Sequence, residues 1–251
     1  MSELNDKKRN INDKKNNKIL DSQGIFHESV LFGILLAIVG GFLDAYTYVG
    51  RDGVFANAQT GNIVLLGVYA AKGAWGQALF HIPPILAFVL GVIVTQAIKT
   101  KASHFFTLDW KRIVLMMEIL VLVVVGFIPQ TYPSIIVNVA ISFVASVQVS
   151  SFSKLVDSPY ATTMCTGNLR SASQAAYQAV TQKDRRSAVI AIRYFMIILF
   201  FVLGAVLGGL LTWKLEAKAV WGCVLILIIV VFLLIISDRN IGTNESDTAG
   251  I

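Results

Sequence analysis

Charged residues, cysteine and histidine are all scarce in this chain of 251 residues. Its two cysteines, Cys165 and Cys223, lie far apart, which gives no sign of a disulfide framework or a CxxC redox pair. The three histidines have no HExxH or other ligand spacing, and Walker, GxGxxG and GxSxG patterns are absent. These absences remove the usual signatures of metal catalysis, a nucleotide-driven pump, a dinucleotide enzyme and a serine hydrolase. We therefore predict that the protein is not an enzyme and that it holds no metal and no cofactor.

Apolar residues dominate instead, with 55% hydrophobic and only 14% charged residues. A transmembrane helix needs about 20 apolar residues, and the backbone in lipid must satisfy its own hydrogen bonds. The sequence therefore predicts an all-α integral membrane protein with six transmembrane helices. The six stretches are 30–49, 82–98, 113–128, 134–153, 189–211 and 220–236.

The polar ends of the chain flank this membrane domain. Residues 1–28 are basic and contain almost nothing to bury, so we predict a disordered cytoplasmic tail. The basic residues are diluted by acids, which favours a topology signal over a nucleic-acid or lipid patch, and we expect no nucleic-acid partner. The membrane domain is expected at 29–237, and a short cytoplasmic tail at 238–251.

Lys and Arg in the short loops predict the orientation, because basic residues resist translocation. Six spans leave both termini in the cytoplasm and put most loop Lys and Arg on the inner side. Eight spans would export Lys99, Lys101, Lys111 and Arg112, so we reject that count. The predicted location is a bacterial plasma membrane.

Two short patterns recur in the same order in the two halves of the chain. Thr60-Gly61-Asn62 is repeated as Thr166-Gly167-Asn168, and the FVLG of 88–91 is repeated at 201–204. With three spans in each half, the second half enters the membrane upside down. We therefore predict an inverted 3+3 repeat with halves 29–128 and 133–237.

Each Thr-Gly-Asn copy precedes a run too short or too polar to be a full span. Threonine is a good N-cap residue, so each copy is expected to start a short helix. If residues 57–71 and 162–182 both re-enter the membrane, two helix N-termini point toward its centre, a setting that suits an anion or a polar solute. The alternative is that both helices lie on the membrane surface.

Asp44 lies inside the first span, where a carboxylate needs a partner or a cavity. Its expected counterpart in the second half is Gln148. Asp44 is our candidate for proton or cation coupling, with a structural role as the alternative.

Glu118 and Arg193 also lie inside spans, at comparable depths. We predict a buried structural ion pair between them, with a snorkelling arginine or a ligand role as alternatives. Small residues four apart, including Gly41, Gly204 and Gly208, predict close helix packing.

Several of these motifs carry a resemblance to a known family. The GGFLDA of 40–45, the QTGN of 59–62, Gln148 and the TGN of 166–168 resemble the YoaK family of bacterial multi-pass membrane proteins. The resemblance implies a membrane location and a multi-span fold. It implies no substrate, because the family is functionally uncharacterised.

The sequence thus predicts a secondary transporter or channel for a small polar solute or ion in the lipid bilayer. The substrate-binding residues expected near the midplane are Asp44, Gln59, Thr60, Gly61, Asn62, Gln148, Thr166, Gly167 and Asn168. The alternative is a non-transporting membrane partner, such as an assembly or sensory subunit. A homo-oligomer is left open.

Overall fold

The computed structural model describes residues 29–101, 108–152, 154–155, 158–159 and 165–248. Its helices are α2 (Val30–Gly50), α3 (Gln59–Ala71), α4 (Trp75–Phe80), α5 (Ile82–Lys101), α6 (Leu108–Gly126), α7 (Ser134–Ser151), α8 (Cys165–Thr181), α9 (Arg185–Leu215), the 3-10 helix η2 (Glu216–Val220) and α10 (Trp221–Thr248). Two-residue strands β1 (Lys154–Leu155) and β2 (Ser158–Pro159) pair antiparallel. The all-helical prediction is confirmed. The predicted tail at 1–28 lies outside the described residues, and α10 continues into the tail predicted at 238–251.

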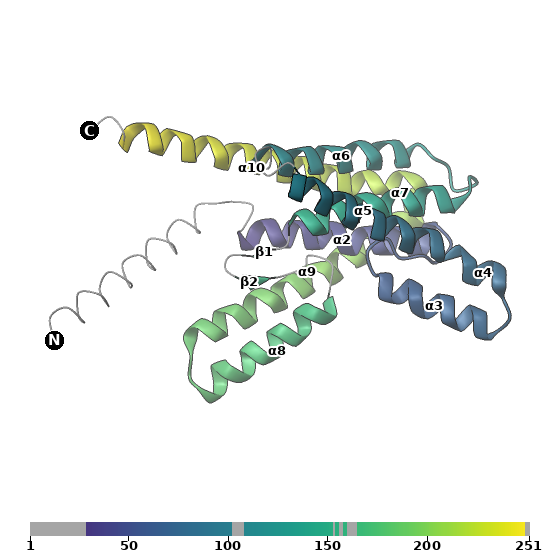
Figure 1. Ribbon diagram of the computed structural model, residues 1–251, viewed down its shortest axis with the longest axis horizontal. Coiled ribbons are helices and arrows are strands. Elements are labelled where there is room, and N and C mark those ends of the chain that lie inside the picture. Colours follow the sequence, from purple (N-terminus) through teal and green to yellow (C-terminus); the bar gives the residue numbers. More distant parts are fainter. Residues whose placement is uncertain (1–28, 102–107, 153, 156–157, 160–164, 249–251) are drawn as a thin grey trace.

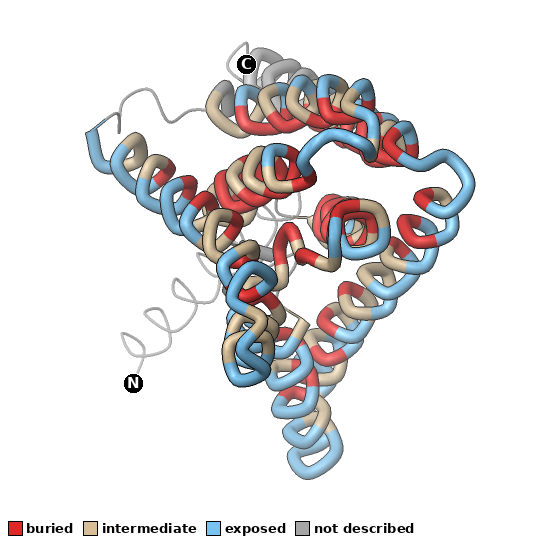
Figure 2. Tube along the Cα trace, turned by 90° about the vertical axis from the view of Figure 1, so that its right-hand side faces the viewer, coloured by how far each residue is buried: buried red, intermediate tan, exposed pale blue. Residues whose placement is uncertain are grey.

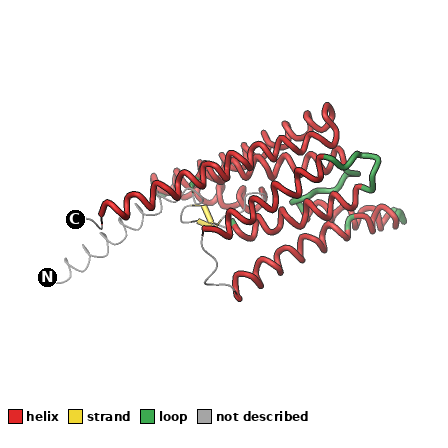
Figure 3. Tube along the Cα trace, turned by 90° about the horizontal axis from the view of Figure 1, so that it is seen from above, coloured by secondary structure: helices red, strands yellow, loops and turns green. Residues whose placement is uncertain are grey.

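The long helices run lengthwise through the molecule (Figures 1 and 3). Helix α2 packs against α9 and α10, α5 packs against α7, and α6 packs against α7 and α10. Helix α8 lies along α9, to which a short turn connects it.

Glycines allow the closest of these contacts. A Cβ atom on Gly41 would lie 2.0 Å from the carbonyl oxygen of Phe201, and one on Gly204 would lie 2.1 Å from that of Ile38. Only a hydrogen fits between the two backbones, so the predicted packing role of these glycines is confirmed. Gly91 approaches α7 in the same way, since its Cβ would lie 2.8 Å from the carbonyl oxygen of Phe143.

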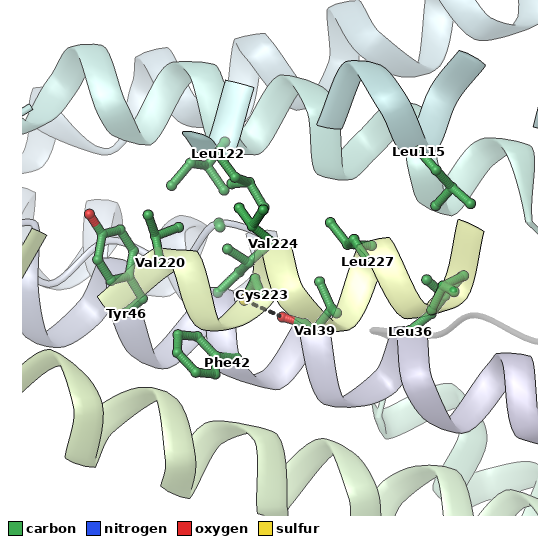
Figure 4. Packing of buried hydrophobic residues seen from close by; sticks show 14 of the residues in the cluster. Leu36, Val39, Phe42, Tyr46, Leu115, Leu122, Val220, Cys223, Val224 and Leu227 are labelled. Atoms are coloured by element: carbon green, nitrogen blue, oxygen red, sulfur yellow. Dashed lines mark hydrogen bonds between the residues drawn. The ribbon is translucent and has the colours of Figure 1, made fainter. Parts of the chain in front are cut away.

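A hydrophobic core fills the space between α2, α6 and α10. Figure 4 shows Leu36 and Val39 of α2 beside Leu227 of α10, with Leu115 and Leu122 of α6 above α10, on the side opposite α2. Many outward-facing side chains are apolar as well: Leu86 on α5 is 61% exposed. Buried positions gather where helices meet, and exposed ones cover the outer faces (Figure 2). An apolar exterior of this kind is what lipid solvates.

Four helical segments are long and apolar enough to cross a membrane. They are Val30–Gly50, Trp75–Lys101, Ser134–Ser151 and Arg185–Ser237. The last has 53 residues and contains both α9 and most of α10, separated by η2. The fold is therefore that of a membrane protein built from several apolar helices.

Helices α3 and α8 leave this bundle in opposite directions. Figure 1 shows both beginning close to α2, from where α3 runs toward one end of the molecule and α8 toward the other. Helix α4 then turns the chain back into α5.

Candidate functional site at the start of α3 and α8

Asp44 lies within two turns of the end of α2 and is 5% exposed. Its Oδ1 accepts the backbone N–H of Asn57 at 2.7 Å and that of Ala58 at 3.3 Å. The Asn57 side-chain amide in turn donates to the Gly40 carbonyl at 3.2 Å. The segment after α2 therefore folds back along α2, and α3 begins beside Asp44.

Asp44 binds the two residues that lead into α3. The residue before α3 is Ala58, which forms no side-chain cap bond, and α8 begins at Cys165. The prediction that each Thr-Gly-Asn copy starts a short helix is confirmed, but Thr60 lies inside the first turn of α3 and is not its N-cap. The carboxylate of Asp44 binds the amides just before α3 instead, through a tertiary contact that local sequence does not reveal.

Asn62 also stabilises the segment between α2 and α3. Its Oδ1 accepts the Phe55 N–H at 3.0 Å, and its Nδ2 donates to the Phe55 carbonyl at 2.8 Å and to Gln59 Oε1 at 2.9 Å. The Gln59 amide donates to the Ala56 carbonyl at 2.9 Å. Since Asn62 is fully buried and all its bonds are local, it shapes the turn.

The two glycines of the repeated tripeptide have different surroundings. A Cβ on Gly61 would lie 2.7 Å from the ring of Phe55, which stacks on Tyr48 with centroids 4.8 Å apart. A Cβ on Gly167 would meet no described atom within 4 Å. Gly61 is therefore required by packing, whereas no described atom crowds Gly167.

A cavity of about 930 Å³ joins the two tripeptide copies. Of the predicted site residues, the structure brings Asp44, Gln59, Thr60, Thr166 and Gly167 to its wall. Gly61, Asn62, Gln148 and Asn168 are not among its lining residues. Asn62 and Asn168 are buried, while Thr60 and Thr166 are exposed.

Most of the cavity wall is apolar. Five aromatic residues from α2, the following turn, α5 and α9 contribute to it: Tyr48, Phe55, Phe88, Phe201 and Trp213. Asp44 is the one acidic residue, and no Lys, Arg or His occurs among the described lining residues. These aromatic residues were not predicted from the sequence, because aromatic residues are common in membrane spans and only their meeting at one cavity distinguishes them.

Gln148 and Glu118 form a separate buried pair. Gln148 Nε2 donates to Glu118 Oε2 at 2.6 Å, and Glu118 is fully buried. The other Glu118 oxygen has no hydrogen-bond partner among the described residues. The predicted pairing of Glu118 with Arg193 is wrong, because similar depth in the bilayer does not place two residues on facing sides of their helices.

Arg51, the residue directly after α2, has a completely buried side chain. Its guanidinium donates to the carbonyls of Pro129 at 3.0 Å and Ile128 at 2.6 Å, and to the Tyr46 hydroxyl at 3.2 Å. Asn138 donates to the Arg51 carbonyl at 2.9 Å. Arg51 thus ties the end of α2 to the loop between α6 and α7.

Within the described part of the chain, no group of three or more His, Cys, Asp or Glu residues could hold a metal ion. Cys165 at the cavity and Cys223 in the core are both free thiols.

The apolar helices, long enough to cross a bilayer, define the chain as a multi-helix transmembrane protein. A family model described as "Protein of unknown function (DUF1275)" matches residues 32–233, and the chain belongs to this family. It is also 27% identical over 140 residues to the UPF0700 transmembrane protein YoaK of Bacillus subtilis (strain 168). That match covers 55% of this chain and spans 62% of the relative's length. The resemblance to the YoaK family is confirmed, and no solved structure matches the chain.

Proposed function

We propose that the protein is a secondary transporter or channel of the bacterial plasma membrane, with its solute site in the cavity beside Asp44. The observation that carries this proposal is that both Thr-Gly-Asn copies border one cavity together with Asp44, a carboxylate buried within an apolar helix. Ionisable groups at membrane depth commonly mark solute or ion pathways.

An inverted repeat with six spans forms the frame of this proposal. Such a repeat makes α2 equivalent to α7, α5 to α9 and α6 to α10. The packing of α2 on α9 then corresponds to that of α7 on α5, and α6 on α7 corresponds to α10 on α2. Gly91 and Gly204, the glycines of the repeated FVLG, both occur at these matching close contacts.

The cavity wall supports the same symmetry. Thr60 and Thr166 line it at matching positions, as do Phe88 and Phe201 of the second repeated pattern. Ala45 and Val149, which follow Asp44 and Gln148, also line it. A site on the pseudo-twofold axis between two inverted halves is the arrangement found in many transporters.

In this inverted arrangement, α3 and α8 are short helices that re-enter the membrane. The hydrogen bonds to Asp44 hold the start of α3 about 9 Å below the end of α2, at 1.5 Å per helical residue. Helix α8 starts at the same cavity and runs the opposite way (Figure 1). With both termini in the cytoplasm, α3 enters from outside and α8 from inside.

Labelling of single cysteines from each side of the membrane tests the proposal. Thr60→Cys and Thr166→Cys are made in a background with Cys165→Ser and Cys223→Ala, in sealed vesicles of known orientation. A transport pathway predicts that a membrane-impermeant thiol reagent reaches each cysteine from both sides. The matched control is Ile93→Cys, which is 58% exposed on the apolar face of α5 and should react only with a lipid-soluble reagent.

Labelling of Thr60→Cys from outside only and of Thr166→Cys from inside only would contradict the proposal. In that case both helices lie at the membrane surface, and a non-transporting membrane partner becomes the better account.

A further inference from the structure

The carboxylate of Asp44 gives the cavity a negative charge that favours a bound cation. Asp44 Oδ1 is occupied by the amides of Asn57 and Ala58, while Oδ2 is buried and accepts no hydrogen bond from any described residue. The described wall has no basic side chain that would neutralise this carboxylate. A buried carboxylate in apolar surroundings is stable only when it is protonated or paired.

An anionic ligand fits this cavity poorly, because the acidic Asp44 is the only charged side chain of the described wall. The amides of Asn57 and Ala58, which precede α3, already donate to Asp44, so they are not free to bind an anion. A polyhydroxylated solute is also disfavoured, because the apolar wall would leave most of its hydroxyls without partners.

The aromatic residues favour a ligand with an apolar body. Tyr48 and Phe55 stack on one another beside Asp44, and Phe88, Phe201 and Trp213 complete the wall. Aromatic faces attract cations and also bury apolar groups. The volume of about 930 Å³ lies within the range of sites that hold drug-sized molecules.

We propose that the cavity binds a monovalent organic cation with an apolar body. Its charge lies beside Asp44, and its body lies against the aromatic wall. This assignment rests on the proposed transport function and names the substrate class of the same site.

Binding to the purified protein tests the assignment without requiring transport. The probes are tetraphenylphosphonium and tetraphenylborate, which have nearly the same shape and opposite charge. Equilibrium dialysis against protein-free micelles should show saturable binding of the phosphonium and none of the borate. Equal binding of the two ions by the unmodified protein would overturn the assignment, since shape and apolarity alone would then explain it.

Asp44→Asn tests the role of the charge. An asparagine keeps the side-chain oxygen that accepts from Asn57 and Ala58, so the turn before α3 should keep its conformation. We expect at least a tenfold loss of phosphonium affinity. Glu118→Gln is the matched control, because Glu118 is a buried carboxylate outside the cavity and its loss should leave the affinity unchanged. Wild-type affinity in Asp44→Asn would overturn the assignment.

The two proposals fail in different ways. Labelling of Thr60→Cys and Thr166→Cys from both sides, without phosphonium binding, would support the transport proposal and refute the cation assignment. Charge-selective binding with one-sided labelling supports the cation assignment and refutes transport.

Discussion

At the residue scale, the positions of the two Thr-Gly-Asn copies have different roles. Asn62 and Gly61 shape the turn that leads into α3, through hydrogen bonds to Phe55 and through room for its ring. Thr60, Thr166 and Gly167 face the cavity instead. A tripeptide that recurs in the sequence therefore need not have one function at all of its positions.

The two glycines give a matched pair of variants. Gly61→Ala should destabilise the folded protein by about 1–3 kcal/mol, because its methyl group overlaps the Phe55 ring. Gly167→Ala should leave stability unchanged or raise it by up to about 1 kcal/mol, because alanine favours a helix and meets no described atom. Thermal unfolding in one detergent compares them, and equal losses in both variants would contradict the account.

At the scale of elements, hydropathy located the helices well. Each of the six predicted ranges coincides largely with α2, α5, α6, α7, α9 or α10, because long apolar runs leave the backbone no alternative to a helix. The sequence alone also indicated Asp44 and the two tripeptides as candidate site residues. It did not predict the contact of Asp44 with the residues before α3 or the pairing of Glu118 with Gln148, because both depend on how segments of the chain pack against one another.

Helix α9 begins with an N-cap outside the apolar region. Asp184 accepts the N–H groups of Arg186 at 3.0 Å and Ser187 at 3.1 Å and the Ser187 hydroxyl at 2.6 Å. The Ser187 hydroxyl and these amides lower the pKa of Asp184 below its usual value of 3.8. Because the folded-state pKa is lower than the unfolded one, the stabilisation is present above about pH 4 and is lost as pH falls through the folded-state value.

Asp184→Ala should therefore lower the unfolding temperature at pH 7, and the difference from wild type should shrink below about pH 4. Asp184→Asn is the control, since asparagine also caps helices but does not titrate in this range. A constant difference between wild type and Asp184→Ala across this pH range would show that the charged cap does not stabilise α9.

At the scale of the whole molecule, the cavity exists because segments far apart in the chain meet. Asp44 and Thr60 come from the first half, and Thr166 and Phe201 come from the second. Two sets of helix contacts between the halves, α2 with α9 and α5 with α7, bring these residues together. A claim about transport therefore depends first on whether α3 and α8 begin at one shared site.

Cross-linking between the two helix starts tests that claim most directly. Thr60→Cys and Thr166→Cys are combined in the cysteine-free background and treated in native membranes with a short bismaleimide, and the linked peptides are identified by mass spectrometry. The control pair is Thr60→Cys with Val180→Cys, which lies about 21 Å further along α8 and is 79% exposed. The account predicts an intramolecular link in the first pair and none in the control. Absence of the link, although each cysteine alone reacts with a monofunctional maleimide, would contradict a shared site.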